Sequence, residues 1–348
     1  MAINGSWRCS LVALYVTSLE GAAGKTSICA GLGKHLVDDG KRVAFIKPVV
    51  AGDEDPAVAN TGGDAAFVKR VLALDDPLEN ICPVVSAHDK LPDKIKEAYS
   101  KVSRDKDVVI IESGWGQGQS YYEIVKALDA RAIIVGDYSK EIDEARLINN
   151  GKGLGGHLLG VVANKVPRSK VDYISNHLSA QLGEAGTNVL AVLPEDRILS
   201  TLTIGELAEH IQGEILNCVD KSAELLENFM LGAMYVDSGL EYFGRKANKA
   251  VVVRGDRPDI QLAALETSTR CLVLSGNMTP IHAVLHGAKD KGIPIVLARG
   301  DTMATVVAIE NALDEVRFGQ EKKLSRLIEI MERLFNFQVA YGELSLAD

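Results

Sequence analysis

Residues 13–27 read Ala13-Leu14-Tyr15-Val16-Thr17-Ser18-Leu19-Glu20-Gly21-Ala22-Ala23-Gly24-Lys25-Thr26-Ser27, an apolar run followed by a loop of small residues. A helical pattern of apolar and polar positions follows the loop and extends to residue 38. A strand, a small-residue loop ending in Gly-Lys-Thr and a helix, in that order, are typical of a phosphate-binding loop. Backbone N–H groups of such a loop and of the helix amino terminus attract oxyanions.

The predicted nucleotide-contacting residues of this loop are Gly21, Ala22, Ala23, Gly24, Lys25, Thr26 and Ser27. Lys25 is expected to reach the β- and γ-phosphates, and the Thr26 hydroxyl is expected to bind Mg²⁺. The usual pattern has a glycine five residues before Gly24, where this chain has Leu19. The alternative interpretation is a strand–turn–helix that contains Gly-Lys-Thr without any phosphate function.

The composition is that of a globular chain of 348 residues, of which 47% are hydrophobic and 24% are charged. This length exceeds one ordinary hydrophobic core and predicts two domains. The net charge of −9 argues against a nucleic-acid partner, whereas a nucleotide needs only a local positive site. Five scattered cysteines and the lack of a long apolar run favour a reduced, cytoplasmic protein with no membrane segment.

Apolar runs alternate with amphipathic helical patterns through the first part of the chain. The predicted strands cover residues 10–17, 42–46, 108–112, 131–135, 159–163 and 189–193. The predicted helices cover residues 25–38, 63–72, 93–102, 121–128, 140–150 and 170–184. This alternation predicts an α/β fold with a doubly wound parallel sheet of the P-loop NTPase type. Ligands of such sheets bind at the carboxyl ends of the strands.

A second alternating pattern predicts a smaller α/β domain with a final amphipathic helix. Its strands are predicted at residues 229–236, 250–253, 271–274 and 295–298, and its helices at 259–266, 280–289, 303–313 and 322–335. The helical pattern at 204–229 is interpreted as a packed connection. We therefore predict a nucleotide-binding domain at residues 1–215 and a second domain at 216–348.

Polar residues follow several of the predicted strands. Glu112 ends one strand and is a candidate Mg²⁺ ligand, because Mg²⁺ prefers oxygen ligands. Lys47 follows another strand, where it would face a phosphate or substrate anion or remain a solvated loop lysine. Asp64 is a second candidate metal ligand or a helix cap. Asn164 is a candidate contact for a purine edge or a turn residue, and the charged loop 254–259 is a ligand loop or a structural turn.

Together, these motifs resemble dethiobiotin synthetase, and more closely the dethiobiotin-synthetase-like amino-terminal region of long phosphate acetyltransferases. The matching segments are residues 15–17, Gly24-Lys25-Thr26, Lys47-Pro48-Val49, Asp64, Glu112-Ser113-Gly114, Asn164-Lys165 and residues 192–197. The later part of the chain resembles the DRTGG domain that follows this region, through residues 253–257, 272–276 and 292–294. The resemblance covers nearly the whole chain, and we expect no acetyltransferase catalytic domain.

The resemblance to dethiobiotin synthetase implies a role for each matching residue. It implies that Mg-ATP is held by Lys25, Thr26, Asp64 and Glu112, that Lys47 meets a carbamate substrate, and that Asn164 lies near adenine. Lys25 and Lys47 are then the catalytic candidates, and the metal ligands are Thr26, Asp64 and Glu112. A homodimer is implied as well.

Two departures from related families limit what the resemblance implies. This chain has Ser18-Leu19-Glu20-Gly21 where dethiobiotin synthetases have Gly-Thr-Asp-Thr, so the substrate side of the loop is replaced. Related filament- and partition-type ATPases have a lysine at the position of Glu20, which argues against that branch.

Three hypotheses follow from the sequence. The first is a regulatory protein that binds Mg-ATP and whose second domain senses a further small ligand or mediates assembly. The second is an ATP-dependent ligase, in which Lys47 holds a carboxylate or carbamate that ATP phosphorylates. The third is a degenerate loop with a structural role only.

Overall fold

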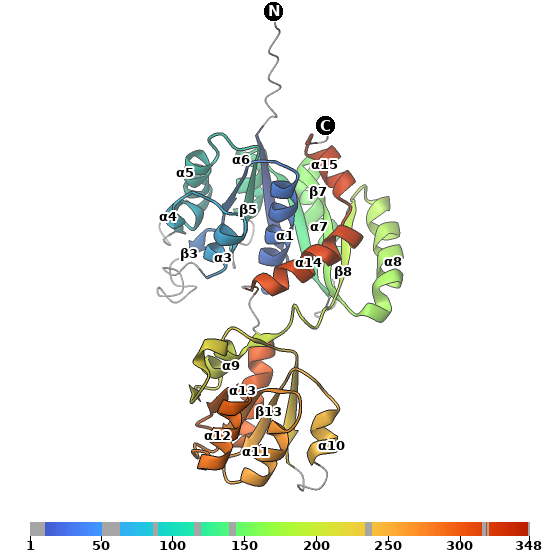
Figure 1. Ribbon diagram of the computed structural model, residues 1–348. Coiled ribbons are helices and arrows are strands. Elements are labelled where there is room, and N and C mark those ends of the chain that lie inside the picture. The colour runs from blue at the N-terminus through green and yellow to red at the C-terminus, as the bar shows by residue number, and fades with distance from the viewer. Residues whose placement is uncertain are drawn as a thin grey trace, which may run out of the picture. The chain divides into compact units, whose positions relative to one another are not determined.

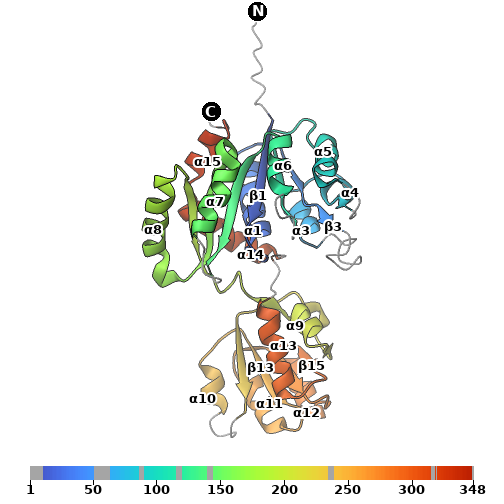
Figure 2. The ribbon, with the colours of Figure 1, turned by 180° about the vertical axis from the view of Figure 1, so that it is seen from behind.

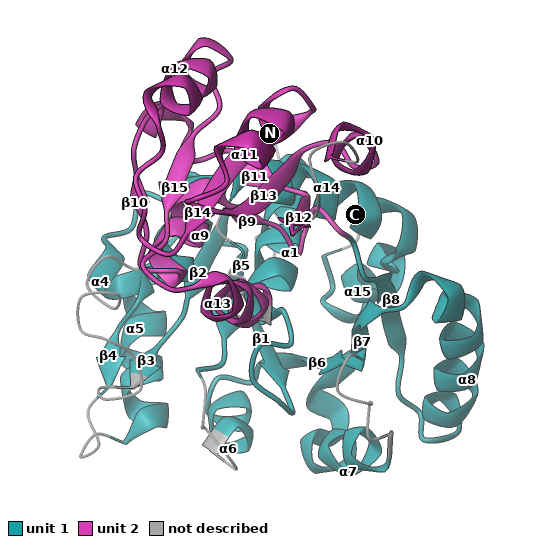
Figure 3. Ribbon diagram, turned by 90° about the horizontal axis from the view of Figure 1, so that it is seen from below, with its two compact units in different colours: residues 1–196, 317–348 teal, residues 197–316 magenta. Residues whose placement is uncertain are grey.

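The computed structural model describes residues 11–50, 63–85, 90–114, 120–138, 144–233, 239–314, 318 and 320–346. The chain divides into two compact units, Met1–Asp196 with Arg317–Asp348, and Arg197–Val316 (Figure 3). Each unit has a largely parallel sheet with helices on both faces, which confirms the predicted α/β class (Figure 1, Figure 2). Every helix among the described residues is too short or too polar to span a bilayer.

The first unit has a six-stranded parallel sheet in the order β2-β5-β1-β6-β7-β8. Its strands are β1 (Val12–Ser18), β2 (Val43–Ile46), β5 (Val108–Glu112), β6 (Arg131–Asp137), β7 (Leu158–Val166) and β8 (Val189–Pro194). A separate small sheet pairs β3 (Val49–Val50) with β4 (Val84–Val85). The central strands β1 and β5 are apolar along their length because helices cover both faces.

Helices of the first unit cover both faces of its sheet. One face packs against α5 (Leu91–Val102), α6 (Ser120–Ala127), α7 (Glu144–Leu154) and α8 (Val171–Glu184). The other carries α1 (Lys25–Asp38), α3 (Gly63–Val71) and α14 (Glu321–Leu334) (Figure 1). The remaining helical segments are α4 (Leu78–Ile81), η2 (Gly155–His157), η3 (Arg168–Lys170) and α15 (Phe337–Glu343).

The second unit has a five-stranded sheet in the order β10-β15-β14-β13-β12. Its strands are β10 (Glu214–Ile215), β12 (Asn228–Gly232), β13 (Lys249–Arg254), β14 (Thr269–Ser275) and β15 (Ile295–Leu297), of which β10 alone pairs antiparallel within this sheet. One face packs against α10 (Gly239–Gly244), α11 (Pro258–Leu265) and α12 (His282–Asp290). The other packs against α9 (Ile204–His210) and α13 (Thr302–Asp314).

The units divide at a different place from the predicted boundary after residue 215. The stretch 204–229, predicted to be helical, contains α9, β10, η4 (Val219–Lys221), β11 (Leu225–Leu226) and the start of β12. Because β10 pairs with β15 and β11 pairs with β9 (Leu202–Thr203), this stretch belongs to the second unit. The end of the predicted strand at residues 234–236 lies outside the described residues.

The amphipathic helix α14 belongs to the first unit rather than to the second. Its buried face includes Leu327 and Met331, which pack against α1 at Gly31. A Cβ atom at Gly31 would lie 2.3 Å from the Met331 sulfur, so the glycine permits this close approach of the two helices. Burial of the apolar face of α14 explains why the chain returns to the first unit.

Asp196 connects α14 to the rest of the first unit. Its buried carboxylate accepts hydrogen bonds from Arg168 Nη2 at 2.7 Å and from Arg326 Nε and Nη2, both at 3.0 Å. We expect Asp196→Ala to lower the free energy of unfolding by about 1–3 kcal/mol, because the two partly exposed guanidinium groups lose their buried acceptor. Urea denaturation measures this change, and an unaltered midpoint would contradict it.

Candidate functional site

The loop between β1 and α1 presents an uncapped helix amino terminus. Gly24 precedes α1 with φ 88° and ψ 25°, and no side chain caps the helix there. The first turn of this fully described helix contains no acidic residue. Its N–H groups and the positive end of the helix dipole are therefore suited to an anion. Gly21 and Ala22 form the turn that leads into this loop, and Ala22 has φ 59°.

Two residues that follow one another on β7 hold the carbonyl groups of the loop. Asn164 Nδ2 donates to Ala23 O at 2.9 Å, and Lys165 Nζ donates to Ala22 O at 2.7 Å. Lys165 also pairs with the buried Asp137 at the end of β6, with 2.8 Å between Nζ and Oδ2. The structure thus places Asn164 against the loop, and its contact with adenine stays a prediction.

Lys165 and Asp137 were not among the predicted site residues. Lys165 could have been identified from the sequence, because it follows Asn164 directly in the Asn-Lys motif. Asp137 gave a weaker signal, since the predicted strand stopped at residue 135 and the carboxylate lies two residues further, at the end of β6. Its position at a strand's carboxyl end was the signal that could have identified it.

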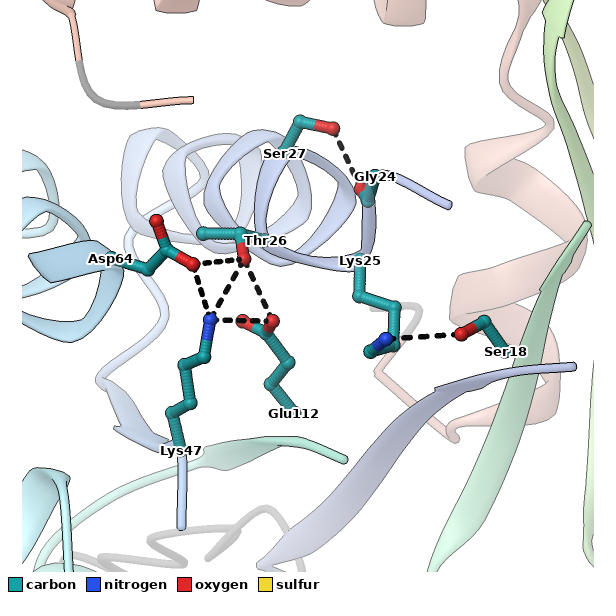
Figure 4. Close-up of polar contacts among 8 residues, drawn as sticks. All are labelled: Ser18, Gly24, Lys25, Thr26, Ser27, Lys47, Asp64 and Glu112. Atoms are coloured by element: carbon teal, nitrogen blue, oxygen red, sulfur yellow. Dashed lines mark hydrogen bonds and ion pairs between the residues drawn. The ribbon is translucent and has the colours of Figure 1, made fainter. Parts of the chain in front are cut away.

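The loop ammonium group is partly buried and lies close to the loop itself. Lys25 Nζ donates to Ser18 Oγ at 3.0 Å, and Ser27 Oγ donates to Gly24 O at 2.6 Å (Figure 4). Burial lowers the pKa of Lys25, and attraction by Glu112 partly offsets this effect. An ammonium group whose charge is disfavoured by burial is stabilised when a phosphate approaches.

The other predicted site residues meet in one cluster, Thr26, Lys47, Asp64 and Glu112 (Figure 4). They come from the first turn of α1, the end of β2, the first turn of α3 and the end of β5. Thr26 Oγ1 donates to Glu112 Oε1 at 2.7 Å and also lies 3.2 Å from Asp64 Oδ2. Lys47 Nζ lies 3.0 Å from Glu112 Oε1 and 2.5 Å from Asp64 Oδ2.

The electrostatics of this cluster are set by burial and by the pairing of opposite charges. Burial alone would lower the pKa of Lys47, but attraction by Glu112 and Asp64 outweighs it, so the pKa of Lys47 is raised. Glu112 Oε2 is buried and has no hydrogen-bond partner among the described residues. A buried carboxylate oxygen without a donor is costly unless something else binds it.

The donor set of the cluster fits Mg²⁺. Two carboxylates and a hydroxyl are oxygen ligands, and Mg²⁺ at phosphate sites typically takes one or two carboxylates and completes its shell with phosphate and water. Among the described residues, no group of three or more His, Cys, Asp or Glu side chains could hold a metal ion. A metal bound by Thr26, Asp64 and Glu112 would therefore depend on further ligands such as phosphate.

The charged loop of the second unit pairs its own residues. Arg254 Nε lies 2.9 Å from Asp256 Oδ1, and Arg257 Nε lies 3.0 Å from Asp259 Oδ1. Each guanidinium group is thus matched by a carboxylate two residues further along the chain. These pairs lie at the end of β13 and at the start of α11.

A strand, a glycine-ended loop and an uncapped helix at the centre of a doubly wound sheet define a P-loop protein. The chain belongs to the AAA domain family, whose profile matches residues 12–203. The profile of the DRTGG domain matches residues 206–312. The predicted relationship to dethiobiotin synthetase and to the amino-terminal region of phosphate acetyltransferases is confirmed by these profiles together with the curated relatives that the chain matches.

Curated relatives match the chain at low sequence identity. The phosphate acetyltransferase of Nitratidesulfovibrio vulgaris is 21% identical, over 92% of this chain and 50% of its own length. The phosphate acetyltransferase of Pseudomonas aeruginosa is 24% identical, over 90% of this chain and 49% of its own length. The ATP-dependent dethiobiotin synthetase of Methanococcus vannielii is 29% identical, over 35% of this chain and 63% of its own length. The chain thus spans about half the length of the phosphate acetyltransferases that it matches.

Proposed function

We propose that the chain binds Mg-ATP at residues 21–27 and acts as a regulatory protein. The observation that carries this proposal is the arrangement around α1. The uncapped helix start and Lys25 form an anion site, and two carboxylates converge on Thr26 beside it. Triphosphate and a divalent cation have the charges that these two adjoining sites require.

The metal ion of this complex would be held by Thr26, Asp64 and Glu112. When bound, Mg²⁺ supplies positive charge that neutralises the phosphate oxygens. The unpartnered Glu112 Oε2 supports this assignment, because a cation would satisfy that oxygen. Lys25 would contact the phosphates directly, and Asn164 with Lys165 would keep the loop carbonyls turned away from them.

An ATP-dependent ligase is the second candidate, and the position of Lys47 favours it. This buried ammonium lies beside the proposed metal ligands, where it could hold the carboxylate or carbamate that ATP would phosphorylate. The loop residues Ser18–Gly21 differ from those of dethiobiotin synthetases, so a substrate other than the biotin precursor would be required. A ligase releases ADP only with its substrate, whereas a sensor binds without turnover.

Calorimetry followed by an ADP-release assay tests both functions. The purified chain is titrated with ATP in the presence of Mg²⁺, and ADP release is then measured with and without diamino-carboxylates. Binding without turnover supports the regulatory function, and substrate-dependent ADP release supports the ligase. The absence of nucleotide binding would refute both and leave the loop a structural role.

Glu112→Gln is expected to weaken the dependence of nucleotide binding on Mg²⁺. The amide keeps the size of the side chain but removes the charge that attracts the cation, so the half-saturating Mg²⁺ concentration should rise about tenfold or more. Mg²⁺ titrations at fixed ATP measure this change. Glu123→Gln, the same substitution on the exposed side of α6, serves as the control. An unchanged titration for Glu112→Gln removes this residue from the metal site.

We also propose that the second unit receives a small-molecule signal and that the chain works as a homodimer. The first part is supported by the separate α/β unit, which has its own core and matches the DRTGG domain. The homodimer rests on the resemblance to dethiobiotin synthetases. Sedimentation equilibrium with and without Mg-ATP tests the oligomeric state. A monomer under both conditions would refute the dimer.

A further inference from the structure

The ammonium group of Lys47 lies among the three groups assigned to the metal ion. Its Nζ atom contacts Asp64 Oδ2 at 2.5 Å, Glu112 Oε1 at 3.0 Å and Thr26 Oγ1 at 3.2 Å (Figure 4). The side chain of Lys47 is 14% exposed and that of Glu112 is 3% exposed, so water screens this contact weakly. A positive charge of the chain itself therefore lies at the centre of the proposed metal ligands.

This position has a direct consequence for a metal ion that arrives alone. An ion that binds both carboxylates would lie close to the ammonium group even if it used the unpartnered Glu112 Oε2. The two cations would repel each other there unless the ammonium group moved away. The displaced Lys47 would then be largely buried without a counter-charge, which is unfavourable. A divalent cation without a nucleotide thus gains little by binding here.

A nucleotide removes this obstacle because it brings its own negative charge. Phosphate oxygens placed at the start of α1 next to Thr26 would offer the displaced ammonium group of Lys47 a new partner. The metal ion could then bind both carboxylates and the phosphates. Lys25 differs from Lys47 in this respect, because its ammonium contacts Ser18 rather than the carboxylates.

We propose that Lys47 is a tethered cation that occupies the metal position until a nucleotide arrives, so that the metal ion and the nucleotide bind only together. This inference rests on the proposed Mg-ATP site and deepens it. The three groups around Lys47 are then held together in the absence of a ligand, and the chain does not bind free divalent cations at this site. The device couples metal binding to nucleotide binding within one unit of the chain.

Mn²⁺ alone is the probe that tests this inference, with electron paramagnetic resonance reporting the free ion. The wild-type chain should bind Mn²⁺ weakly without a nucleotide and about tenfold or more tightly with ADP. Lys47→Met removes the charge at similar volume and should bind Mn²⁺ about tenfold or more tightly without a nucleotide. The effect of ADP on Mn²⁺ affinity should shrink accordingly in this variant.

Two control variants separate the role of Lys47 from a general change in charge. Lys34→Met deletes an ammonium of the same α1 helix that pairs with Asp38 at the surface, and it should keep the weak wild-type affinity for free Mn²⁺. Lys47→Arg keeps a cation at the same place and should also bind free Mn²⁺ weakly. Because Lys47→Met leaves two carboxylates without their ion pair, its melting temperature should fall in EDTA and recover when Mn²⁺ is added.

Tight binding of free Mn²⁺ by the wild-type chain would overturn the inference, as would a Lys47→Met variant with unchanged affinity. A Lys47→Met chain that unfolds and is not rescued by Mn²⁺ counts against it too. The metal-only titrations contain no nucleotide, so their outcome is independent of the ATP titration. A chain that fails to bind ATP refutes the proposed function, whereas unaltered metal affinity in Lys47→Met refutes only the role of Lys47.

Discussion

Lys25→Ala should abolish measurable Mg-ATP binding while the chain stays folded. Lys25 is the loop ammonium closest to the start of α1, and burial already lowers its pKa, so it gains most when an anion arrives. Loss of a half-buried charged partner of a phosphate is expected to weaken binding by about a hundredfold or more. Calorimetric titration of the variant with ATP and Mg²⁺ measures this loss.

Folding of the Lys25→Ala variant is checked separately from binding. In the unliganded chain the substitution removes one hydrogen bond, from Lys25 to Ser18, so the thermal midpoint should change little. Lys34→Ala, on the same helix, removes a lysine that pairs with Asp38 at the surface and should leave the ATP affinity intact. Wild-type affinity in Lys25→Ala would show that the loop does not hold phosphate.

The architecture of the first unit could be predicted because its strands are buried on both faces. Such strands are apolar over nearly their whole length, as in β1 and β5, and helices with one polar face separate them. The pattern also located Glu112 at the end of β5 and Asp64 at the start of α3. Since parallel strands end at one edge of the sheet, these carboxylates were expected near the loop, and the structure brings both to Thr26.

Contacts between distant segments could not be predicted in the same way. The periodicity of α14 shows that the helix has an apolar face but does not indicate which sheet covers it. Its place against α1 depends on the absence of a side chain at Gly31, a property of the packed pair. The strand pattern placed Lys47 at the end of β2 but did not indicate its protein partners, which are the carboxylates of Asp64 and Glu112.

Gly24→Ala is expected to destabilise the loop and to abolish Mg-ATP binding as well. A Cβ atom at Gly24 would lie 2.3 Å from Asn164 Nδ2, and the backbone has φ +88°, where side chains are rarely tolerated. Asn164 would have to leave Ala23 O, so the loop would lose one of its two ties to β7. We expect the free energy of unfolding to fall by about 2–4 kcal/mol, measured by urea denaturation.

Gly40→Ala provides a control that separates backbone strain from collision. Gly40 follows α1 with φ +76°, and a Cβ atom there would meet nothing within 4 Å. Gly40→Ala should therefore cost only the strain, about 1 kcal/mol, and should bind Mg-ATP as the wild type does. The difference between the two variants reports the collision with Asn164. Equal losses of stability in both variants would show that the Asn164 side chain moves away from the new Cβ atom at little energetic cost.

The double variant Gly24→Ala/Asn164→Ala tests whether ATP binding requires the hydrogen bond from Asn164 to Ala23 O or only the absence of a collision at Gly24. Removing the Asn164 amide relieves the collision, so part of the stability lost in Gly24→Ala should return. Binding should not return, because Ala23 O then has no amide donor from β7 and nothing keeps that carbonyl turned away from the phosphates. Recovery of wild-type ATP affinity in the double variant would mean that the loop holds its shape without Asn164, and that Lys165 alone suffices as its anchor.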